Sequence, residues 1–384
     1  MAINKGEKKL KGIYLVPDPL MMKPHFGPSE HIKVGLQELK KYFDIHLLIL
    51  GGQDFSGEIQ KPDRSLTKGV ATKNGFAGLL RDLKLLFTSN RNIRSLVRQL
   101  KNQDIDFIYE RGQYLNLKGV KAAKRLGISH YYEVNWLNFL GIRQFYESWF
   151  NHIARRIEEW SYRQSTLNFF IGTQHKLIDI PAKKVHTIQN GIDEELLDRN
   201  KDHRNSVNGK IRICYVANLM PHHRFDVFIE ALKIAGVEEQ LELHMVGYNF
   251  EEFEAMLPRG LVYFLHGPKK KEELPAIMRA CNIGLISGGP SYSSFMKLFE
   301  YAAFRMCVIC PDLENIRLMF DEDEIVFFET DNAASLAAQL QDLCRHPDHI
   351  GQYGDKIYKK VKDRYTWEKI YKDVSEQIIN SMTA

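Results

Sequence analysis

Residues 291–310 read SYSSFMKLFEYAAFRMCVIC, and the two halves of this stretch favour different secondary structures. The run from Phe295 to Phe304 contains good helix formers and no Pro or Gly, and Ser293 or Ser294 is a natural N-cap, so a helix is predicted to begin near Ser294. The MCVIC run that follows (306–310) is typical of a short buried strand. A helix followed at once by a buried strand is the repeating unit of a parallel sheet covered by helices.

The same alternation extends in both directions from this stretch. The predicted strands of the first half are 12–16, 44–50, 106–110, 130–134, 167–171 and 184–188, and those of the second half are 211–217, 241–247, 261–267, 282–287, 306–310 and 324–328. The polar stretch 190–210 separates the two sets. The pattern predicts an α/β protein with two doubly wound, Rossmann-like domains facing a cleft, at 1–190 and 191–360, and a C-terminal helix (361–384) that crosses back to the first domain.

Composition is that of a globular protein, with 44% hydrophobic and 26% charged residues in 384. No apolar run of 18 residues is present, and the basic N-terminus leads into a strand-like stretch without the apolar segment of a signal peptide. We therefore expect a cytoplasmic protein. The five cysteines include the pair in CVIC, but no second pair completes a metal site, so buried free thiols are expected.

Positive charge is concentrated in one segment. Between Lys61 and Lys101 there are ten Lys or Arg residues and two Asp, although the net charge of the whole chain is only +5. Arg91, Arg94, Arg98 and Lys101 form one helical stripe beside an apolar one, and further apolar residues lie between 79 and 87. Residues 79–101 could bind an anionic membrane surface, or could form a helix with solvated charges. No recognised module accompanies the charge, so nucleic acid is not expected as a partner.

Lys297 places a cation in the first turn of the predicted helix, where the helix N-terminus is already positive. A bound phosphate would neutralise both charges, whereas the alternative is an ordinary ion pair with Glu300 one turn on. Arg224 repeats the arrangement after another strand, and the two cations together suggest a diphosphate. Glu300 could accept hydrogen bonds from the two hydroxyls of a ribose.

Several kinds of site are not supported by motifs. There is no Gly-x-Gly-x-x-Gly after a strand, no phosphate-binding Gly-Lys-Ser/Thr loop, no His-Glu-x-x-His and no Gly-x-Ser-x-Gly elbow. These absences argue against nicotinamide-dependent and ATP-dependent chemistry.

The stretch SYSSFMKLFEYAAFRMCVICPDLENIR resembles the nucleotide-sugar segment of retaining glycosyltransferase family 4, the group 1 glycosyl transferases, in which Ser-x-x-Lys-x-x-Glu-Tyr precedes a turn and a strand. The resemblance continues through YVANLMPHHRFDVFIEAL, LHMVGYN and YTWEKIY, and through GPSEHIKVGLQEL, DFIYERGQYLNLKGV and TIQNGID in the first half. It implies the GT-B fold, a UDP- or GDP-linked sugar donor bound mainly by the second domain, no metal, and no cofactor other than the donor substrate itself.

The resemblance also implies roles for individual residues. Glu300 would bind the donor ribose, and Lys297 would hold the diphosphate together with backbone amides. Gly27 would approach the donor phosphates, and the polar residues at the end of the fourth strand, Glu133 and Asn135, are candidate catalytic residues with Lys297 and Arg224. Further donor-site residues are Tyr292, Ser293, Ser294, Phe295, Met296, Asn218, His223, Arg224 and Gly247, and acceptor-side residues are Ser29, His31 and Arg111.

Three positions depart from the family pattern. Asn218 and His223 stand where an Arg and a Lys usually grip the phosphates, and Tyr292 stands where a Glu usually contacts the transferred sugar. The expected function is transfer of a sugar, with retention at the anomeric carbon, to a saccharide or lipid-linked acceptor in polysaccharide or glycoconjugate synthesis. A nucleotide-sugar 2-epimerase of the same fold and a catalytically silent partner subunit remain as alternatives.

Overall fold

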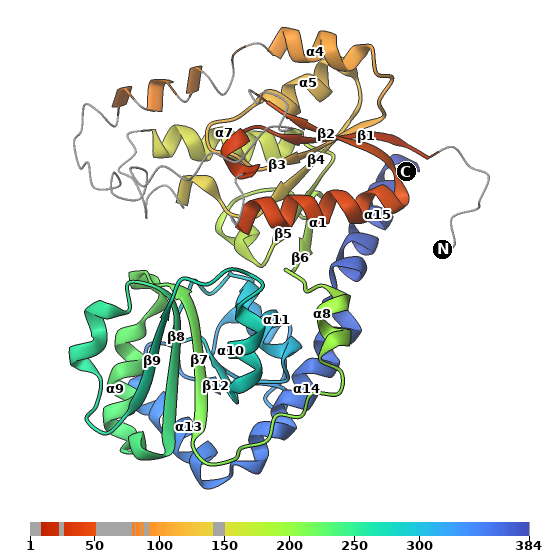
Figure 1. Cartoon of the computed structure of the whole chain (residues 1–384). Coiled ribbons are helices and arrows are strands. Elements are labelled where there is room, and N and C mark those ends of the chain that lie inside the picture. Colours follow the sequence, from red (N-terminus) through yellow and green to blue (C-terminus); the bar gives the residue numbers. More distant parts are fainter. Residues whose placement is uncertain are drawn as a thin grey trace. The chain divides into compact units, whose positions relative to one another are not determined.

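The computed structural model describes residues 9–22, 27–50, 79–80, 82–84, 86–87, 91, 93–140 and 150–383 (Figure 1). The chain forms two compact units. The first contains Met1–Ile188 and Tyr371–Ala384, and the second contains Gln189–Ile370. Of the basic stretch identified in the sequence, residues 61–78, 81, 85, 88–90 and 92 lie outside the described residues.

The first unit contains a six-stranded sheet in the order β2-β1-β3-β4-β5-β6, and all neighbouring strands are parallel. Its elements are β1 (Lys11–Val16), η1 (Pro19–Met22), α1 (Gly27–Tyr42), β2 (Asp44–Ile49), α4 (Ile93–Lys101), β3 (Phe107–Arg111), α5 (Lys118–Leu126), β4 (Ser129–Val134), α7 (Asn151–Gln164), β5 (Leu167–Ile171), η2 (Gln174–Leu177), η3 (Ala182–Lys184) and β6 (Val185–Ile188).

Helices cover both faces of this sheet. On one face, α4 and α5 pack on β1 and β3 through an apolar cluster that includes Leu96, Leu100 and Ile108, and α7 packs beside them on β4 and β5. On the other face, α15 (Trp367–Thr383) contacts β4, where the Tyr131 hydroxyl donates to the Ile378 carbonyl at 3.3 Å. Figure 1 shows α4 next to α5, and α1 on the opposite side of the sheet. The strand order reverses between β1 and β3, so the loops after these strands diverge at the carboxyl edge.

The second unit contains another six-stranded parallel sheet, in the order β12-β11-β10-β7-β8-β9. Its elements are α8 (Glu194–Arg199), β7 (Ile211–Asn218), η4 (Pro221–His223), α9 (Phe225–Ala235), η5 (Glu238–Gln240), β8 (Leu241–Tyr248), η6 (Glu251–Met256), β9 (Val262–Gly267), α10 (Leu274–Ala280), β10 (Ile283–Leu285), α11 (Met296–Ala303), β11 (Cys307–Pro311), α12 (Glu314–Arg317), β12 (Val326–Phe328), α13 (Ala333–Arg345) and α14 (Asp348–Arg364).

Two apolar clusters fill the space on the two faces of the second sheet. One lies under α9 and α13, and the other lies under α11 and α14. Helix α11 packs closely because a Cβ on Gly284 of β10 would overlap the Tyr301 ring. The Tyr301 hydroxyl in turn accepts a hydrogen bond from Val216 N at 2.9 Å. These contacts hold α11 against β7 and β10.

The predicted α/β architecture is confirmed. All twelve predicted strands are present, six in each sheet, with bounds that differ by a few residues at most. The five cysteines are free thiols, and four of them are buried. None of the described helices has the length and the apolar character that crossing a bilayer requires.

Candidate functional site

The candidate site lies at the carboxyl edge of the second sheet, where the strand order reverses between β7 and β10. In open parallel sheets the loops on either side of such a reversal diverge and leave room for a ligand. Here η4 follows β7, and α11 follows β10 after a loop. The elements that carry the predicted donor residues are therefore neighbours.

Helix α11 begins at Met296, and Phe295 is its N-cap residue without a side-chain cap. The predicted cap at Ser294 is wrong, because Ser294 bonds elsewhere. Its hydroxyl accepts a hydrogen bond from Asn190 N at 2.9 Å, and its carbonyl accepts one from Asn190 Nδ2 at 2.6 Å. Within the described part of the chain, the backbone N–H groups of residues 294–297 have no hydrogen-bond partner. Four such donors in succession can bind an anion.

Lys297 lies in the first turn of α11 and is partly buried. Its Nζ lies 5.4 Å from the centroid of the Tyr215 ring, and no carboxylate of the described residues lies within 4.0 Å of it. The alternative of a simple ion pair with Glu300 is therefore wrong. Burial lowers the pKa of Lys297 to about 8, and the nearby Glu300 opposes this shift. Lys297 is a cation near neutral pH whose charge a ligand can neutralise.

His223 supplies a neutral hydrogen-bond donor beside Lys297. Its Nδ1 accepts from Met220 N at 3.0 Å, so the ring proton lies on Nε2. Burial, with a smaller effect of Lys297, lowers the pKa of His223 to about 3. The backbone of His223 is held in place because its carbonyl accepts hydrogen bonds from the hydroxyls of Ser287 and Tyr215, at 2.7 and 3.2 Å. His223 can therefore donate to a phosphate oxygen but contributes no positive charge at pH 7.

Arg224 is the N-cap residue of α9 and has a left-handed backbone conformation (φ 50°). Its guanidinium contacts the carboxylate of Asp226 at 3.1 Å and also that of Asp331. Both contacts neutralise its charge, so this geometry favours an ion-pair role. Its contact with a diphosphate stays a prediction.

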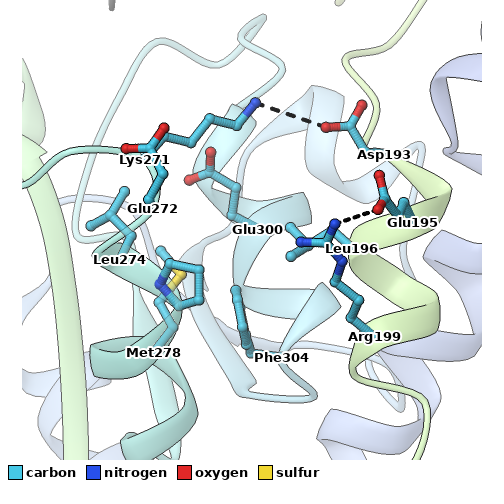
Figure 2. A pocket seen from close by; sticks show the side chains of 11 residues that line it. Asp193, Glu195, Leu196, Arg199, Lys271, Glu272, Leu274, Met278, Glu300 and Phe304 are labelled. Atoms are coloured by element: carbon cyan, nitrogen blue, oxygen red, sulfur yellow. Dashed lines mark hydrogen bonds and ion pairs between the residues drawn. The ribbon is translucent and has the colours of Figure 1, made fainter.

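Glu300 lies one turn after Lys297 and forms a wall of a cavity of about 350 Å³ (Figure 2). Within the described chain its carboxylate has no hydrogen-bond or ion-pair partner, and burial raises its pKa. Lys271 Nζ and Asp193 Oδ2 lie 3.8 Å apart at the mouth of the same cavity. The remaining lining residues are Glu195, Leu196, Arg199, Glu272, Leu274, Pro275, Met278 and Phe304.

No motif in the sequence pointed to Lys271, Asp193 or Arg199. Lys271 lies after β9 and Asp193 after the NGI turn, so both follow strands, which was an available signal. Their approach to Glu300 depends on the packing of α8 and α10, which no local pattern in the sequence indicates. The cavity combines apolar walls with carboxylates and cations, as a nucleoside site does.

The other predicted donor residues are close in sequence to this edge but have different environments. Asn218 is exposed at the end of β7, and Tyr292 is partly buried in the loop before α11. The Ser293 carbonyl accepts from Asn315 Nδ2 at 3.0 Å, and the Met296 side chain is exposed. Gly247 has φ 130°, and a Cβ there would overlap the Ala217 carbonyl, so the sheet itself requires this glycine.

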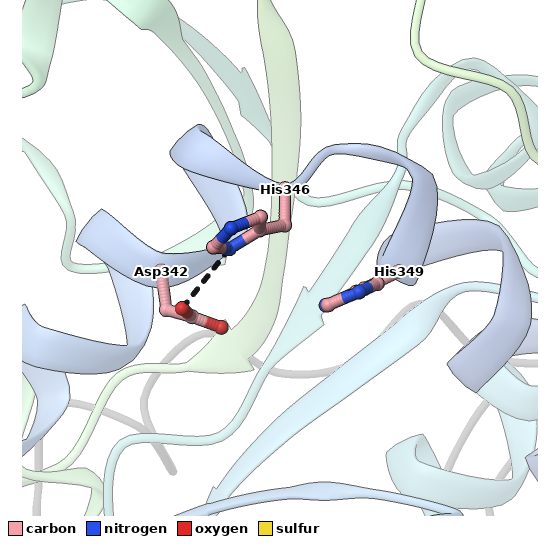
Figure 3. Close-up of side chains that lie close together, drawn as sticks. All are labelled: Asp342, His346 and His349. Carbon is pink, nitrogen blue, oxygen red and sulfur yellow. Dashed lines mark hydrogen bonds and ion pairs between the residues drawn. The ribbon is translucent and has the colours of Figure 1, made fainter.

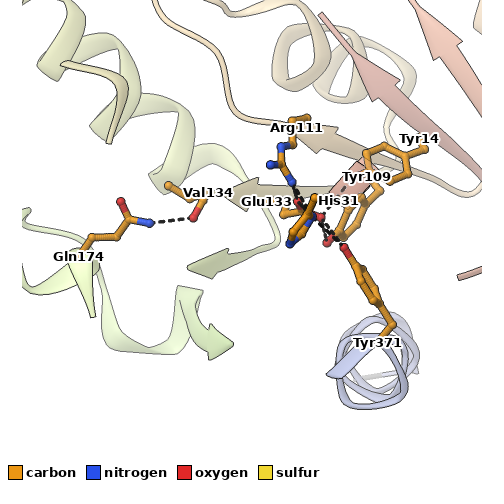
Figure 4. Close-up of polar contacts among 8 residues, drawn as sticks. All are labelled: Tyr14, His31, Tyr109, Arg111, Glu133, Val134, Gln174 and Tyr371. Carbon is orange, nitrogen blue, oxygen red and sulfur yellow. Dashed lines mark hydrogen bonds and ion pairs between the residues drawn. The ribbon is translucent and has the colours of Figure 1, made fainter. Parts of the chain in front are cut away.

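In the first unit, Glu133 is fully buried at the end of β4 (Figure 4). Its Oε2 accepts hydrogen bonds from Tyr109 at 2.7 Å, from Tyr14 at 3.2 Å and from Tyr371 at 3.3 Å. Its Oε1 contacts the Arg111 guanidinium, and also His31 Nδ1 at 3.2 Å. A carboxylate with all its acceptor sites used is suited to positioning its neighbours. A catalytic role for Glu133 stays a prediction.

The structure brings together two of the three predicted acceptor-side residues. Arg111 Nη1 and His31 Nδ1 are 2.8 Å apart, and both side chains are buried next to Glu133. Ser29 is buried in the first turn of α1, which begins at Gly27. Asn135 is exposed just after β4, so of the two predicted catalytic residues of this unit it is the one that solvent reaches.

Among the described residues, one group of side chains is close enough to share a metal ion: Asp342, His346 and His349, at the junction of α13 and α14 (Figure 3). Their ligand atoms lie within 4.8 Å of one another, and the Asp342 carboxylate lies 3.1 Å from His346 Nδ1. Both histidines are exposed. None of the three residues lines the Glu300 cavity.

Comparison with known proteins bears on the fold. A family model described as glycosyl transferase-like matches residues 224–376. A search of curated proteins found no match. Among solved structures, HepE of Anabaena in complex with UDP and glucose has a TM-score of 0.63 at 13% identity, covering 97% of this chain and 100% of that one.

Two further structures are similar over nearly their whole lengths. Sucrose-phosphate synthase from Thermosynechococcus elongatus has a TM-score of 0.66 at 12% identity, with 97% of this chain and 99% of that one covered. A glycosyltransferase from Rickettsia africae has a TM-score of 0.66 at 14% identity, with 98% and 99% covered. The chain has the GT-B fold. The GT-B prediction is thereby confirmed, and the second GT-B domain carries the site built around Lys297 and Glu300.

Proposed function

We propose that the protein is a retaining glycosyltransferase that takes a sugar from a nucleoside diphosphate. One observation carries this proposal. Lys297 and Glu300 are partly buried residues of opposite charge on the same turn of α11, and neither has an ion-pair partner in the described chain. Leaving two such charges unpaired is unfavourable unless a ligand satisfies both.

A nucleoside diphosphate has the groups that satisfy these charges. The free amides of residues 294–297, Lys297 and the Nε2–H of His223 suit a diphosphate, and Glu300 suits the hydroxyls of a ribose. The cavity beyond Glu300 is large enough for a base, and Leu274, Met278 and Phe304 provide its apolar walls. The complex of Anabaena HepE with UDP and glucose supports a UDP-linked donor, with a GDP-linked donor as the alternative.

Transfer breaks the bond between the anomeric carbon and the diphosphate oxygen. Negative charge grows on that oxygen, and Lys297 with the α11 amides would stabilise it without a metal ion. In the proposed step the acceptor oxygen bonds to the anomeric carbon on the face of the sugar that the phosphate leaves, and the leaving phosphate accepts the proton of the acceptor hydroxyl. This course retains the configuration and needs no protein nucleophile.

For the acceptor we propose a saccharide or a lipid-linked saccharide in polysaccharide or glycoconjugate synthesis, bound by the first unit near Arg111, His31, Ser29 and Asn135. The basic surface of residues 79–101 would bind an anionic membrane, which places the proposed reaction on the cytoplasmic face. No nucleic-acid partner is proposed.

A catalytically silent partner subunit is the second candidate, and specific observations favour it. His223 is neutral where the related pattern has a Lys, Asn218 replaces an Arg, and Tyr292 replaces the Glu that contacts the sugar. This candidate predicts that the protein binds a nucleoside diphosphate but neither hydrolyses nor transfers its sugar.

Calorimetric titration with UDP and GDP tests the donor site. We expect Lys297→Ala and Glu300→Ala each to weaken binding by at least about tenfold, with melting temperatures within a few degrees of the parent protein. His346→Ala is the control, because His346 is exposed and does not line the Glu300 cavity, and this variant should bind UDP and GDP like the parent protein. Unchanged affinity in both site variants would remove the proposed site. Release of UDP from a UDP-linked sugar in the presence of an acceptor mixture then separates an active transferase from a silent subunit.

A further inference from the structure

One face of the first unit has a groove between two helices that the proposed function does not yet use. It lies between α5 and α7, has a volume of about 490 Å³, and is lined by Leu117, Lys121, Ile153, Arg156, Ile157 and Trp160. Four of these six side chains are apolar, and Ile153 is 43% exposed. Lys121 and Arg156 place a positive charge on each helix.

Most exposed large apolar side chains of the described first unit lie on α7 or on a segment next to it. Five large apolar residues of the described first unit are exposed, and four of them are Leu80, Leu83, Phe87 and Ile153. The segment that carries the first three lies next to α7, because the Asp82 carboxylate accepts from Phe150 N at 3.4 Å and Leu86 packs on the cluster under α7. Large apolar patches on a soluble domain are typical of an interaction surface.

The surrounding surface is strongly basic. Helices α4 and α5, which pack side by side on this face, contain no Asp or Glu and carry Arg94, Arg98, Lys101, Lys118, Lys121, Lys124 and Arg125. In the described chain, none of Arg94, Arg98, Lys101, Lys121 and Arg125 forms an ion pair. An apolar groove surrounded by uncompensated cations is complementary to an amphiphile with an apolar chain and an anionic head.

The groove begins near the carboxyl edge of the first sheet. Both α5 and α7 begin at the carboxyl edge of the first sheet, since each follows a strand, and the lining residues lie in their first turns and middle. A head group at the carboxyl end of the groove would therefore lie at the edge where Asn135 and the loop after β3 are found. Ligands of parallel sheets bind at this edge.

We propose that the α5–α7 groove binds one hydrocarbon chain of an anionic lipid in a bilayer, and that the acceptor is a saccharide carried on such a lipid. The assignment of the lipid as acceptor rests on the proposed transferase function, whereas binding of the lipid does not. Trp160 lines the groove, so in this proposal its indole contacts the hydrocarbon chain of the bound lipid.

Vesicles of phosphatidylglycerol with brominated chains provide the test, because bromine quenches a tryptophan that it contacts. The chain contains Trp136, Trp149, Trp160 and Trp367, so the parent protein is compared with Trp160→Phe. We expect bromine-dependent quenching in the parent and its loss in Trp160→Phe, although that variant still sediments with the vesicles. No quenching in the parent, or equal quenching in both proteins, would overturn the groove assignment.

A matched pair of substitutions tests the apolar contact. Ile153→Asp should weaken sedimentation with phosphatidylglycerol vesicles at least about tenfold, because it places a charge in the groove. Ile234→Asp, on α9 of the second unit, is the control, since Ile234 is 49% exposed on a helix but lies outside this face. Lys121→Gln and Arg156→Gln should each lower affinity about fivefold, and vesicles of phosphatidylcholine should bind none of the proteins.

The two proposals fail separately. Ile153 is exposed, so the melting temperature of Ile153→Asp should match that of the parent protein. Ile153 is not part of the donor site in the second unit, so the UDP affinity of the variant should also be unchanged. Vesicle binding without UDP binding would support the lipid groove and contradict the proposed donor site. UDP binding with no sedimentation of the parent, or with equal loss in Ile153→Asp and Ile234→Asp, would remove the lipid groove.

Discussion

The two units have the same architecture but treat the carboxylate at the carboxyl edge of the sheet in opposite ways. In the first unit, Glu133 is fully buried and is bonded by Arg111, His31 and three tyrosines. In the second unit, Glu300 has no bonded partner in the described chain, and neither has the cation one turn before it. The carboxyl edge of the sheet therefore holds a completed network at the end of a strand in one unit and an incomplete one on a helix in the other.

This difference indicates where a ligand belongs. A buried carboxylate with every acceptor site used stabilises the fold and has no free acceptor site of its own for a substrate. A charge left without partners makes binding favourable, because a ligand recovers the lost interactions.

Removal of the saturated carboxylate should have the largest effect. Glu133→Ala leaves Arg111 buried without its counter-charge, and we expect the free energy of unfolding of the first unit to fall by about 3–5 kcal/mol. Glu300→Ala removes no hydrogen bond or ion pair within the described chain and should cost less than about 1 kcal/mol. Urea unfolding followed by circular dichroism measures both values. Equal losses in the two variants would contradict the distinction between the networks.

The sequence predicted the elements of both networks but not their completion. The twelve strands follow from short apolar runs, and Lys297 and Glu300 follow from their positions on a helix after a strand. The saturation of Glu133 depends on Tyr14, Tyr109 and Tyr371, and the last of these lies 238 residues further along the chain. Ser294 is taken from its helix by Asn190, which lies 104 residues away. Such pairings come from tertiary packing, which local patterns do not encode.

The pH dependence of nucleotide binding should reveal the unpaired cation. Because the pKa of Lys297 is about 8 in the free protein, deprotonation removes its charge as the pH rises through that value. A bound diphosphate favours the protonated form, so UDP affinity should be highest near pH 7 and fall roughly tenfold by pH 9. Calorimetry over this range measures the change.

Lys297→Arg is the matched control for this titration. A guanidinium stays protonated throughout the range, so the affinity of the variant should be nearly independent of pH. The same slope in the parent protein and in Lys297→Arg would show that another group causes the change.

The C-terminal helix should contribute a smaller, measurable amount to the first network. Tyr371→Phe removes the hydroxyl that donates to Glu133 at 3.3 Å, which should lower the free energy of unfolding by about 1 kcal/mol. Gly35 makes this contact possible, because a Cβ there would overlap the Tyr371 hydroxyl. Tyr248→Phe, at an exposed tyrosine of the second unit, should leave stability unchanged. An equally large loss of unfolding free energy in Tyr248→Phe would contradict the proposed contribution of the C-terminal helix to the Glu133 network.

Metal removal should have the smallest effect, and it tests whether the second network is completed by the ligand alone. The proposed diphosphate site takes its positive charge from Lys297 and the α11 amides, and Glu300, one turn further along α11, is assigned to the ribose. In this proposal no magnesium ion is needed to neutralise the diphosphate. The Asp342, His346 and His349 group has mixed nitrogen and oxygen ligands, which suit zinc or copper better than magnesium, and it does not line the cavity.

UDP affinity should therefore be the same in EDTA and in magnesium, within about twofold, and His346→Ala should not alter either value. A tenfold or larger gain with magnesium would mean that the ion, and not Lys297 with the free amides, neutralises the diphosphate.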